Sequence, residues 1–264
     1  MNLAPPPATD LLLDLLSVPA GRALSAKALC SAGEHLGLPE NAVRVALTRL
    51  VQQQKIAKVG RGAYALHPSR LPLILDVAGW QARIEQMTEW HEGWIAVADP
   101  ALPAAQRTVQ RRHERALALG GFRTWKPGLH LRPDNLTGGS RTLRDRLPAL
   151  GLAPGAELLS LHPLDGDQFE VVVGLWDVNG LRQTYRDLLQ EVRRSEKRRS
   201  GATIGQAAQE SLVIGRAAIA QLARDPLLPS QIMKGEERGT LVEALNEYQR
   251  ESAVLWRELL GLTI

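Results

Sequence analysis

Residues 38–66 read LPENAVRVALTRLVQQQKIAKVGRGAYAL. The first part has apolar residues at helical spacing and starts beside Pro39, whose missing backbone N–H costs nothing in the first turn of a helix. The second part has two strand-like segments, 55–59 and 63–66, around the Gly-Arg-Gly at 60–62, where glycine permits the positive φ of a tight turn. The stretch therefore predicts an amphipathic helix followed by a two-stranded hairpin.

The predicted helix has two different faces, since successive residues lie about 100° apart around its axis. One face carries the apolar stripe Val43, Ala46, Leu47, Leu50 and Val51, and the other carries Asn41, Arg44, Val45, Thr48, Arg49 and Gln52. Amide, hydroxyl and guanidinium groups on such a face hydrogen-bond base edges and phosphates in a DNA major groove. The alternative is that these polar side chains only solvate a surface helix.

Two further helices are predicted upstream of this stretch. Thr9 and Asp10 can begin a helix through Leu11, Leu12, Leu15 and Leu16, and Ser25 can cap a second one. Two short helices, a polar helix and a basic hairpin are the order of a winged helix-turn-helix. Lys58 and Arg61 of the hairpin are then expected to contact phosphate or a narrow minor groove.

Positive charge is concentrated in the first 70 residues. They contain eight Lys plus Arg against four Asp plus Glu, whereas the rest of the chain contains 24 of each. The formal net charge of +4 therefore belongs entirely to the segment with the predicted helices and hairpin. A basic field of this kind attracts DNA phosphate without regard to sequence, and it weakens as salt rises.

Composition disfavours several other classes of protein. A chain of 264 residues predicts two or three domains with substantial cores. It has no apolar run of about 18 residues to span a membrane, and MNLAPPPATD at 1–10 resembles a flexible tail and not an export signal. The single cysteine, Cys30, rules out an internal disulfide, disfavours a cysteine-built zinc site and is expected to be buried.

The predicted fold class is α+β, in four segments. Residues 1–70 form a winged helix-turn-helix domain, 71–92 a linker helix, 93–176 a ferredoxin-like central domain and 177–264 a helical C-terminal domain. The linker prediction rests on the helical spacing of Leu75, Trp80, Ile84, Met87 and Trp90.

The central segment has the order strand, helix, strand, strand, helix, strand, which is typical of ferredoxin-like domains. Strands are predicted at 94–98, 122–125, 129–132 and 157–162, and helices at 104–119 and 141–150. The β-branched run Val171-Val172-Val173 predicts one more strand, over 169–176.

The C-terminal segment is helical from Asn179, with apolar stripes over 181–192, 212–222 and 241–260. In the last of these helices, Leu245, Leu255, Leu259 and Leu260 fit either a core or an interface. The basic run Arg193, Arg194, Lys197, Arg198 and Arg199 either contacts DNA or is the solvated end of a helix.

No catalytic constellation is evident, so the chain is not expected to be an enzyme. There is no nucleophile elbow, phosphate loop or dinucleotide fingerprint, and the six histidines have no metal-ligand spacing. The alternative of a metal-dependent nuclease depends on Asp99, which directly follows a predicted strand, as in nucleases of the CRISPR spacer-acquisition class. One carboxylate alone is a poor divalent-metal site, and Asp-Pro is also an ordinary turn.

The chain resembles PaaX-type regulators of phenylacetic acid catabolism over roughly residues 10–260. The resemblance is carried, in order, by AVRVALTRLVQQQKI with VGRGAYAL, by WHEGWIAVADP, by GGFRTWKPGLHLRP and by IGRAAIAQLARDPLLPSQI. It implies a cytoplasmic bacterial repressor that binds double-stranded operator DNA as a homodimer. It also implies release by an aryl-CoA thioester, typically phenylacetyl-CoA, with no other cofactor and no structural metal.

The resemblance assigns DNA reading to Arg44, Thr48 and Arg49 and a wing to Arg61. An aryl-CoA needs cationic groups for its phosphates and aromatic groups for its acyl part, for which the candidates are Trp94, Trp125, Arg132 and Arg216. Ordinary core packing explains the tryptophans equally well. The chain departs from the family at 232–239, IMKGEERG, where an aromatic and proline-containing stretch is common, so a different aromatic acid is an alternative effector.

A third class is open as well. A winged helix can dock protein instead of DNA, and the helices would then only assemble partners. The localised basic charge and Arg61 favour nucleic acid. Dependence of binding on DNA sequence separates the two interpretations.

Overall fold

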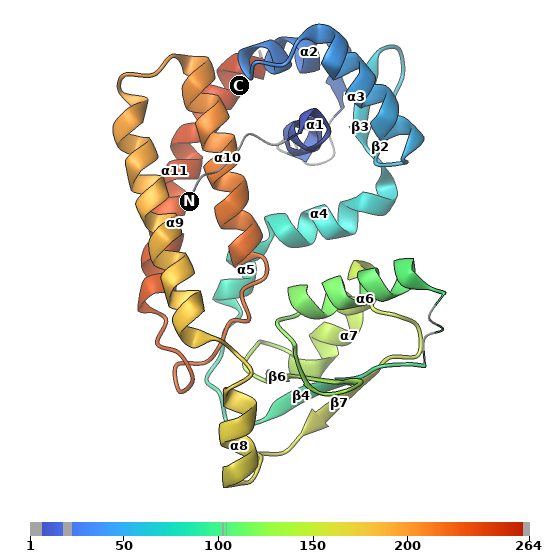
Figure 1. Cartoon of the computed structure of the whole chain (residues 1–264), viewed down its shortest axis with the longest axis vertical. Coiled ribbons are helices and arrows are strands. Elements are labelled where there is room, and N and C mark those ends of the chain that lie inside the picture. Colours follow the sequence, from blue (N-terminus) through green and yellow to red (C-terminus); the bar gives the residue numbers. More distant parts are fainter. Residues whose placement is uncertain (1–6, 18–22, 102, 104, 261–264) are drawn as a thin grey trace. The chain divides into compact units, whose positions relative to one another are not determined.

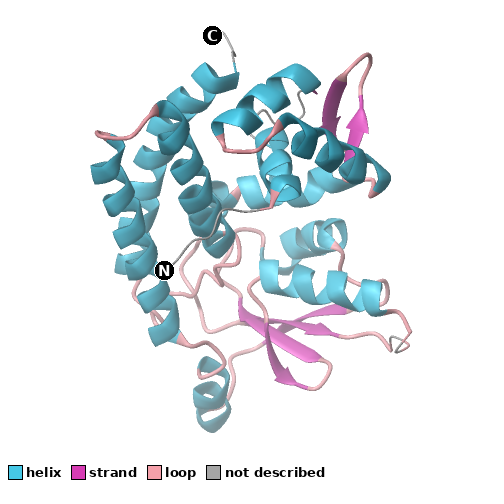
Figure 2. Cartoon of the chain, turned by 45° about the horizontal axis from the view of Figure 1, so that its top comes forward, coloured by secondary structure: helices cyan, strands magenta, loops and turns pink. Residues whose placement is uncertain are grey.

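The computed structural model describes residues 7–17, 23–101, 103 and 105–260 (Figure 1). Of the tail predicted at 1–10, residues 1–6 lie outside the described residues, whereas the tail prediction is wrong for Ala8–Asp10, which form the first turn of a helix. Helices and two small antiparallel sheets make up the described chain, which confirms the mixed α+β class (Figure 2). The chain forms two compact units, of which the first comprises Met1–Leu75, Thr184–Ala218 and Arg238–Ile264 and the second comprises Asp76–Gln183 and Ile219–Glu237.

The N-terminal part of the first unit alternates helices with short strands. Its elements are α1 (Ala8–Ser17), β1 (Leu24–Ser25), α2 (Ala26–His35), α3 (Glu40–Gln52), β2 (Ile56–Lys58) and β3 (Ala63–Leu66). The three strands form one antiparallel sheet in the order β1-β3-β2. A short 3-10 helix, Pro68–Arg70, leads into α4 (Leu71–Ala78).

Local sequence signals explain these elements. The Ser25 side chain caps α2 by accepting a hydrogen bond from the Ala28 backbone N–H at 3.1 Å. Pro39 stands directly before the first turn of α3. Gly60 and Gly62 have φ of 69° and 70°, the positive values that the tight turn requires. The predicted caps and turn are therefore confirmed.

One hydrophobic core holds the first unit together. It contains the predicted leucines of α1, the apolar stripe of α3 and the buried Cys30. Ala208 and Leu212 of α10 (Ile204–Leu222) and Trp256 of α11 (Glu236–Leu260) belong to the same core. The N-terminal elements and the C-terminal helices therefore pack as one body. The predicted boundaries at 70 and 177 stay predictions.

The second unit is built on a four-stranded sheet. Its strands are β4 (Trp94–Ala98), β5 (Arg123–Lys126), β6 (Leu129–Pro133) and β7 (Glu157–Leu161), all antiparallel to their neighbours in the order β5-β6-β4-β7. Helices α6 (Arg107–Leu119) and α7 (Gly139–Leu150) cover one face of this sheet (Figure 1). The unit also contains α5 (Trp80–Glu85). The predicted strand and helix order of this segment is confirmed.

The strand predicted over 169–176 is wrong, because these residues begin within a helix, α8 (Gly166–Val173). The intrinsic cost of valine in a helix is a few tenths of a kcal/mol, which packing easily overrides. Helical spacing lets Val172 be buried while Phe169 stacks on Trp90, with ring centroids 6.1 Å apart. Asp167 in the first turn also favours a helix.

The continuous linker helix predicted over 71–92 is also wrong. The chain forms two helices, α4 and α5, separated at Gly79, and helix α5 already ends at Glu85. Glycine is a poor helix former because it loses the most backbone entropy on ordering. Trp80 and Trp90 are buried as expected, whereas Leu75 is 54% exposed.

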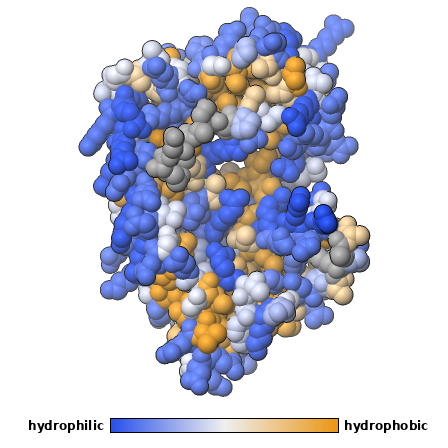
Figure 3. All heavy atoms as spheres, viewed as in Figure 1, coloured by the Kyte–Doolittle hydropathy of each residue, from blue (hydrophilic) through white to orange (hydrophobic). Residues whose placement is uncertain are grey.

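No helix in the described part of the chain is long and apolar enough to cross a membrane. The long helix α9 (Val178–Arg199) instead presents hydrophilic residues along its outer side (Figure 3).

Candidate nucleic-acid interface

The outer face of α3 is exposed along its length. We call Asn41, Arg44, Val45, Thr48, Arg49 and Gln52 the α3 surface, and all six side chains are exposed. Lys58 and Arg61 in and beside the β2–β3 turn are exposed too. The fold thus places every side chain predicted to contact DNA where a large partner can reach it. Contact with DNA itself stays a prediction.

Local hydrogen bonds orient part of the α3 surface. Arg44 donates from Nε to Glu40 Oε1 at 2.8 Å, one helical turn away. Thr48 donates its hydroxyl to the Arg44 carbonyl at 3.0 Å, and Asn41 Oδ1 accepts the Ala42 backbone N–H at 2.8 Å. These three side chains are therefore held close to the helix.

Three cationic side chains on α3 and the β2–β3 hairpin are available to bind a ligand. Arg49, Lys58 and Arg61 have no hydrogen-bond or ion-pair partner among the residues that the structure describes. The turn that carries Arg61 is anchored, since the Ala26 N–H donates to the Gly62 carbonyl at 2.7 Å. A guanidinium on an anchored turn is well placed to bind phosphate.

The basic run of α9 is mostly neutralised by carboxylates. Arg194 pairs with Glu191 at 2.9 Å, Arg199 pairs with Glu251 at 2.5 Å, and Arg198 pairs with Glu210. This pairing favours the solvated helix end over DNA contact for this run.

Arg216 of α10 joins the C-terminal helices to α1. Its guanidinium lies 3.0 Å from Asp10 Oδ2 and 3.2 Å from Asp14 Oδ2. Burial raises the pKa of Asp14 to about 6, although the charge of Arg216 acts in the opposite direction. This predicted effector residue is thus committed to an ion-pair cluster within the first unit.

Asp99, His113 and His130 meet in the second unit, although they are far apart in sequence. Asp99 follows β4, His113 lies on α6 and His130 lies on β6 beside β4. His113 Nε2 is 2.8 Å from Asp99 Oδ1 and His130 Nε2 is 3.0 Å from Asp99 Oδ2. Sequence spacing alone did not reveal this cluster. The predicted pairing of strands 94–98 and 129–132 could have placed Asp99 near His130, but no signal pointed to His113.

The hydrogen bonds of His113 determine what the cluster can do. Its Nδ1 accepts the backbone N–H of Ala153 at 3.1 Å, so the ring proton of neutral His113 is on Nε2 and is donated to Asp99. A metal on Nε2 would require the proton on Nδ1, facing the N–H of Ala153. Metal-bound histidines usually donate their second ring N–H, and this one accepts.

Asp99 fits the role of an acceptor carboxylate. Partial burial acts to raise its pKa, but hydrogen bonds from His130 and His113 outweigh burial and the pKa is lowered. One ligand atom from each residue lies within 4.8 Å of the others, close enough for a cation. The bond from Ala153 nevertheless favours a structural hydrogen-bond cluster.

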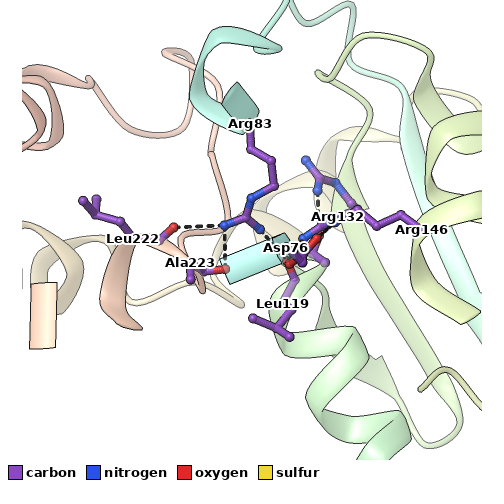
Figure 4. Close-up of polar contacts among 8 residues, drawn as sticks. Asp76, Arg83, Leu119, Arg132, Arg146, Leu222 and Ala223 are labelled. Atoms are coloured by element: carbon purple, nitrogen blue, oxygen red, sulfur yellow. Dashed lines mark hydrogen bonds and ion pairs between the residues drawn. The ribbon is translucent and has the colours of Figure 1, made fainter. Parts of the chain in front are cut away.

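Arg132, another predicted effector residue, is buried like Arg83, and the partly buried Arg146 lies near both (Figure 4); we call these three residues the arginine network. Arg132 donates to the carbonyls of Gly120 at 2.6 Å and Pro133 at 3.0 Å, and to Asn135 Oδ1 at 3.2 Å. Burial, and then the charge of Arg146, lower its pKa to about 9. Each nitrogen of its guanidinium therefore donates to a group of the protein.

Arg83 and Arg146 extend this network to helix ends. Arg83 donates to the carbonyls of Leu119 at 3.0 Å and Ala223 at 2.8 Å (Figure 4). Arg146 pairs with Asp76 at 2.5 Å and also donates to the Leu119 carbonyl at 3.0 Å. These carbonyls end α6 and follow α10, where the negative ends of helix dipoles favour cations.

The remaining effector candidates are tryptophans of the second unit. Trp94 is fully buried and stacks on Trp176 with ring centroids 6.0 Å apart. The indole N–H groups of both rings lack a hydrogen-bond partner among the described residues. Trp125 is partly buried, with Lys126 Nζ 4.4 Å from its ring centre. Trp94 and Arg132 lie on paired strands but on opposite faces of the sheet.

Comparison with known proteins indicates the fold alone. No protein-family model matches the chain, and no curated protein sequence is similar to it. A solved structure, described as the uncharacterized protein Rv0674 from Mycobacterium tuberculosis, superimposes with a TM-score of 0.63 at 20% sequence identity. The match covers 96% of this chain and 98% of that one, so the two proteins share the same arrangement of elements over nearly their whole length.

Proposed function

We propose that this chain is a DNA-binding transcriptional repressor of the PaaX type that controls an aromatic-acid catabolic operon. The observation that carries the proposal is the α3 surface, where Arg49 has no partner among the described residues and Arg61 lies on the adjoining anchored turn. The element order α1, β1, α2, α3, β2, β3, with the sheet order β1-β3-β2, supports a winged helix-turn-helix. In this interpretation α3 enters the major groove and the β2–β3 turn is the wing.

The second unit supports the remainder of this architecture. Its strand order β5-β6-β4-β7, with helices α6 and α7 between strands, fits a ferredoxin-like domain. Two readers on a homodimer would bind half-sites about one helical turn apart, because a single small reader contacts too few base pairs for strong discrimination. We place this repressor in the bacterial cytoplasm, where its DNA is.

We propose that the operator is released because the effector binds two states of the protein with different affinities. We infer that an aryl-CoA thioester, such as phenylacetyl-CoA, binds one protein state more tightly and thereby changes the presentation of the two reading helices. The core shared by α3, α10 and α11 supports such coupling, as does the ion pair of Arg216 with Asp10. The indole N–H groups of Trp94 and Trp176, which have no hydrogen-bond partner among the described residues, can each donate a hydrogen bond to a ligand carbonyl.

The repressor proposal is tested by selecting genomic fragments that the purified full-length protein retains, and footprinting them. A protected palindrome upstream of a catabolic operon is expected, with affinity that falls steeply between about 50 and 200 mM salt. Retention of all fragments in proportion to their length would contradict the proposal and favour the protein-docking alternative.

The effector is tested separately on the selected operator. Phenylacetyl-CoA is expected to release the protein, whereas free CoA controls for the phosphates alone. Release by another aryl-CoA but not by this one would retain the repressor and correct the ligand. Indifference to every aryl-CoA would overturn the effector assignment.

A second candidate, a metal-dependent nuclease, has one observation in its favour, the three clustered ligand atoms of Asp99, His113 and His130. Cleavage of nucleic acid that requires Mn²⁺ or Mg²⁺ and disappears in Asp99→Asn would establish it. The acceptor role of His113 Nδ1 predicts no such activity.

A further inference from the structure

The centre of the α3 surface is apolar. Val45 is 67% exposed, more than any other large hydrophobic residue in the described chain. An exposed valine contributes little to folding by burial, and valine is a weaker helix former than alanine or the long polar residues. The stability of α3 therefore does not explain a valine here.

The neighbours of Val45 make this apolar centre specific. Asn41 and Arg49 lie one helical turn before and after it, and Thr48 lies three residues on. The Thr48 hydroxyl is donated to the Arg44 carbonyl. A small apolar spot is thus surrounded by hydrogen-bonding and cationic groups.

Resting on the proposed DNA-binding function, we propose that Val45 contacts the C5-methyl group of a thymine, so that each operator half-site has a T·A pair beneath the middle of α3. Thymine carries the one apolar group on the major-groove edges of the four bases. A valine facing the polar edge of another base would remove water from that edge without replacing its hydrogen bonds. Val45 is thereby a specificity-determining residue within the proposed reading surface.

Replacement of single thymines in the selected operator by deoxyuridine tests this directly, since the substitution removes only the methyl group. Fluorescence polarisation with full-length protein is expected to show a loss of affinity of about three- to tenfold at one position in each half-site. The other thymines should tolerate the change. Val45→Ala should reduce the preference for thymine over deoxyuridine, because its shorter side chain lies farther from the methyl group.

Val254→Ala is the matched control, because Val254 is 59% exposed on α11 of the same unit. This variant should keep the full preference for thymine. If specific binding survives every deoxyuridine substitution unchanged, or if Val45→Ala retains the preference, the inference is wrong while the repressor proposal stands. Absence of any sequence-specific binding would overturn the proposed function, and this inference with it.

Discussion

The α3 surface and the arginine network both gather arginine residues, but they use them in opposite ways. On α3, Arg49 is exposed and has no protein partner among the described residues. In the arginine network, Arg83 and Arg132 are buried, and the Nη atoms of both donate to backbone carbonyls or an amide oxygen. We infer that a guanidinium indicates a ligand site only where it is exposed and its donors have no protein partner. Residue counts do not make that distinction.

The cost of removing the arginine charge from water differs between the two regions. Burial lowers the pKa of Arg83 to about 10 and that of Arg132 to about 9, which reflects the cost of removing a charge from water. Carbonyls of Leu119, Gly120 and Ala223 offset this cost at helix ends. The exposed guanidinium of Arg49 stays hydrated and therefore contributes little to the stability of the free protein.

The largest effect is expected from Arg132→Met, which keeps the side-chain volume but removes every donor. The carbonyls of Gly120 and Pro133 and the amide oxygen of Asn135 would lose a donor, at a cost of about 1–3 kcal/mol in the free energy of unfolding for each acceptor left unsatisfied. Urea unfolding followed by circular dichroism measures it. Arg49→Met, the exposed counterpart, should change stability by about 0.5 kcal/mol or less. Equal effects of the two variants on stability would contradict the different roles of the buried Arg132 and the exposed Arg49.

When operator affinity is measured instead of stability, the substitution on α3 should have the larger effect. Arg49→Ala is the variant that tests this. Removing this cation and donor should weaken operator affinity by about 1–3 kcal/mol, roughly 5- to 150-fold, and leave the melting temperature unchanged. Arg194→Ala on α9, a paired and exposed arginine, serves as the control for charge loss alone. Operator affinity that falls equally in both variants would assign the binding to net charge.

Asp14→Asn tests, through the pH dependence of stability, whether Asp14 carries its charge beside Arg216. The pKa of Asp14 is raised to about 6, so its stabilising contribution is present below the unfolded value of 3.8 and is lost as pH rises through about 6. The melting temperature of the variant, relative to the wild type, should therefore be higher at pH 7 than at pH 4.5. Asp10→Asn, which removes the other carboxylate that pairs with Arg216, is the matched control. A difference that does not vary with pH would contradict the assignment.

The smallest effect is expected from Glu40→Gln. The change frees Arg44 and removes a negative charge near the DNA, so operator affinity should rise by about two- to threefold. Glu34→Gln on α2 makes the same change of charge without touching Arg44. If the two variants raise affinity equally, the Glu40–Arg44 pair has no part in reading DNA.

Sequence could predict what short-range signals determine. Ser25, Pro39 and the glycines at 60 and 62 act on their own turns, so the caps, α3 and the hairpin were predicted close to where they occur. The order of elements around β4 to β7 followed from alternating apolar segments in the same way.

Long-range contacts were not predictable. The meeting of Asp99 with His113 and His130 depends on a helix crossing the sheet, and Arg83 finds its carbonyls 36 and 140 residues away. The error at α8 has the same origin, because Phe169 stacks on Trp90 and Val172 is buried, and such packing overrides local β propensity. The candidate effector residues depend on such contacts too, which is why composition alone could not distinguish packing from binding.

The central claim is that the α3 surface reads operator sequence. The most direct measurement is a fluorescence-polarisation competition on the chain's own upstream promoter DNA, with unlabelled promoter duplex against a scrambled duplex of identical composition, for wild type and Arg49→Ala. We expect that wild-type protein prefers the promoter by about a thousandfold or more and that Arg49→Ala loses much of that preference. Equal competition by the two duplexes with wild-type protein would contradict it.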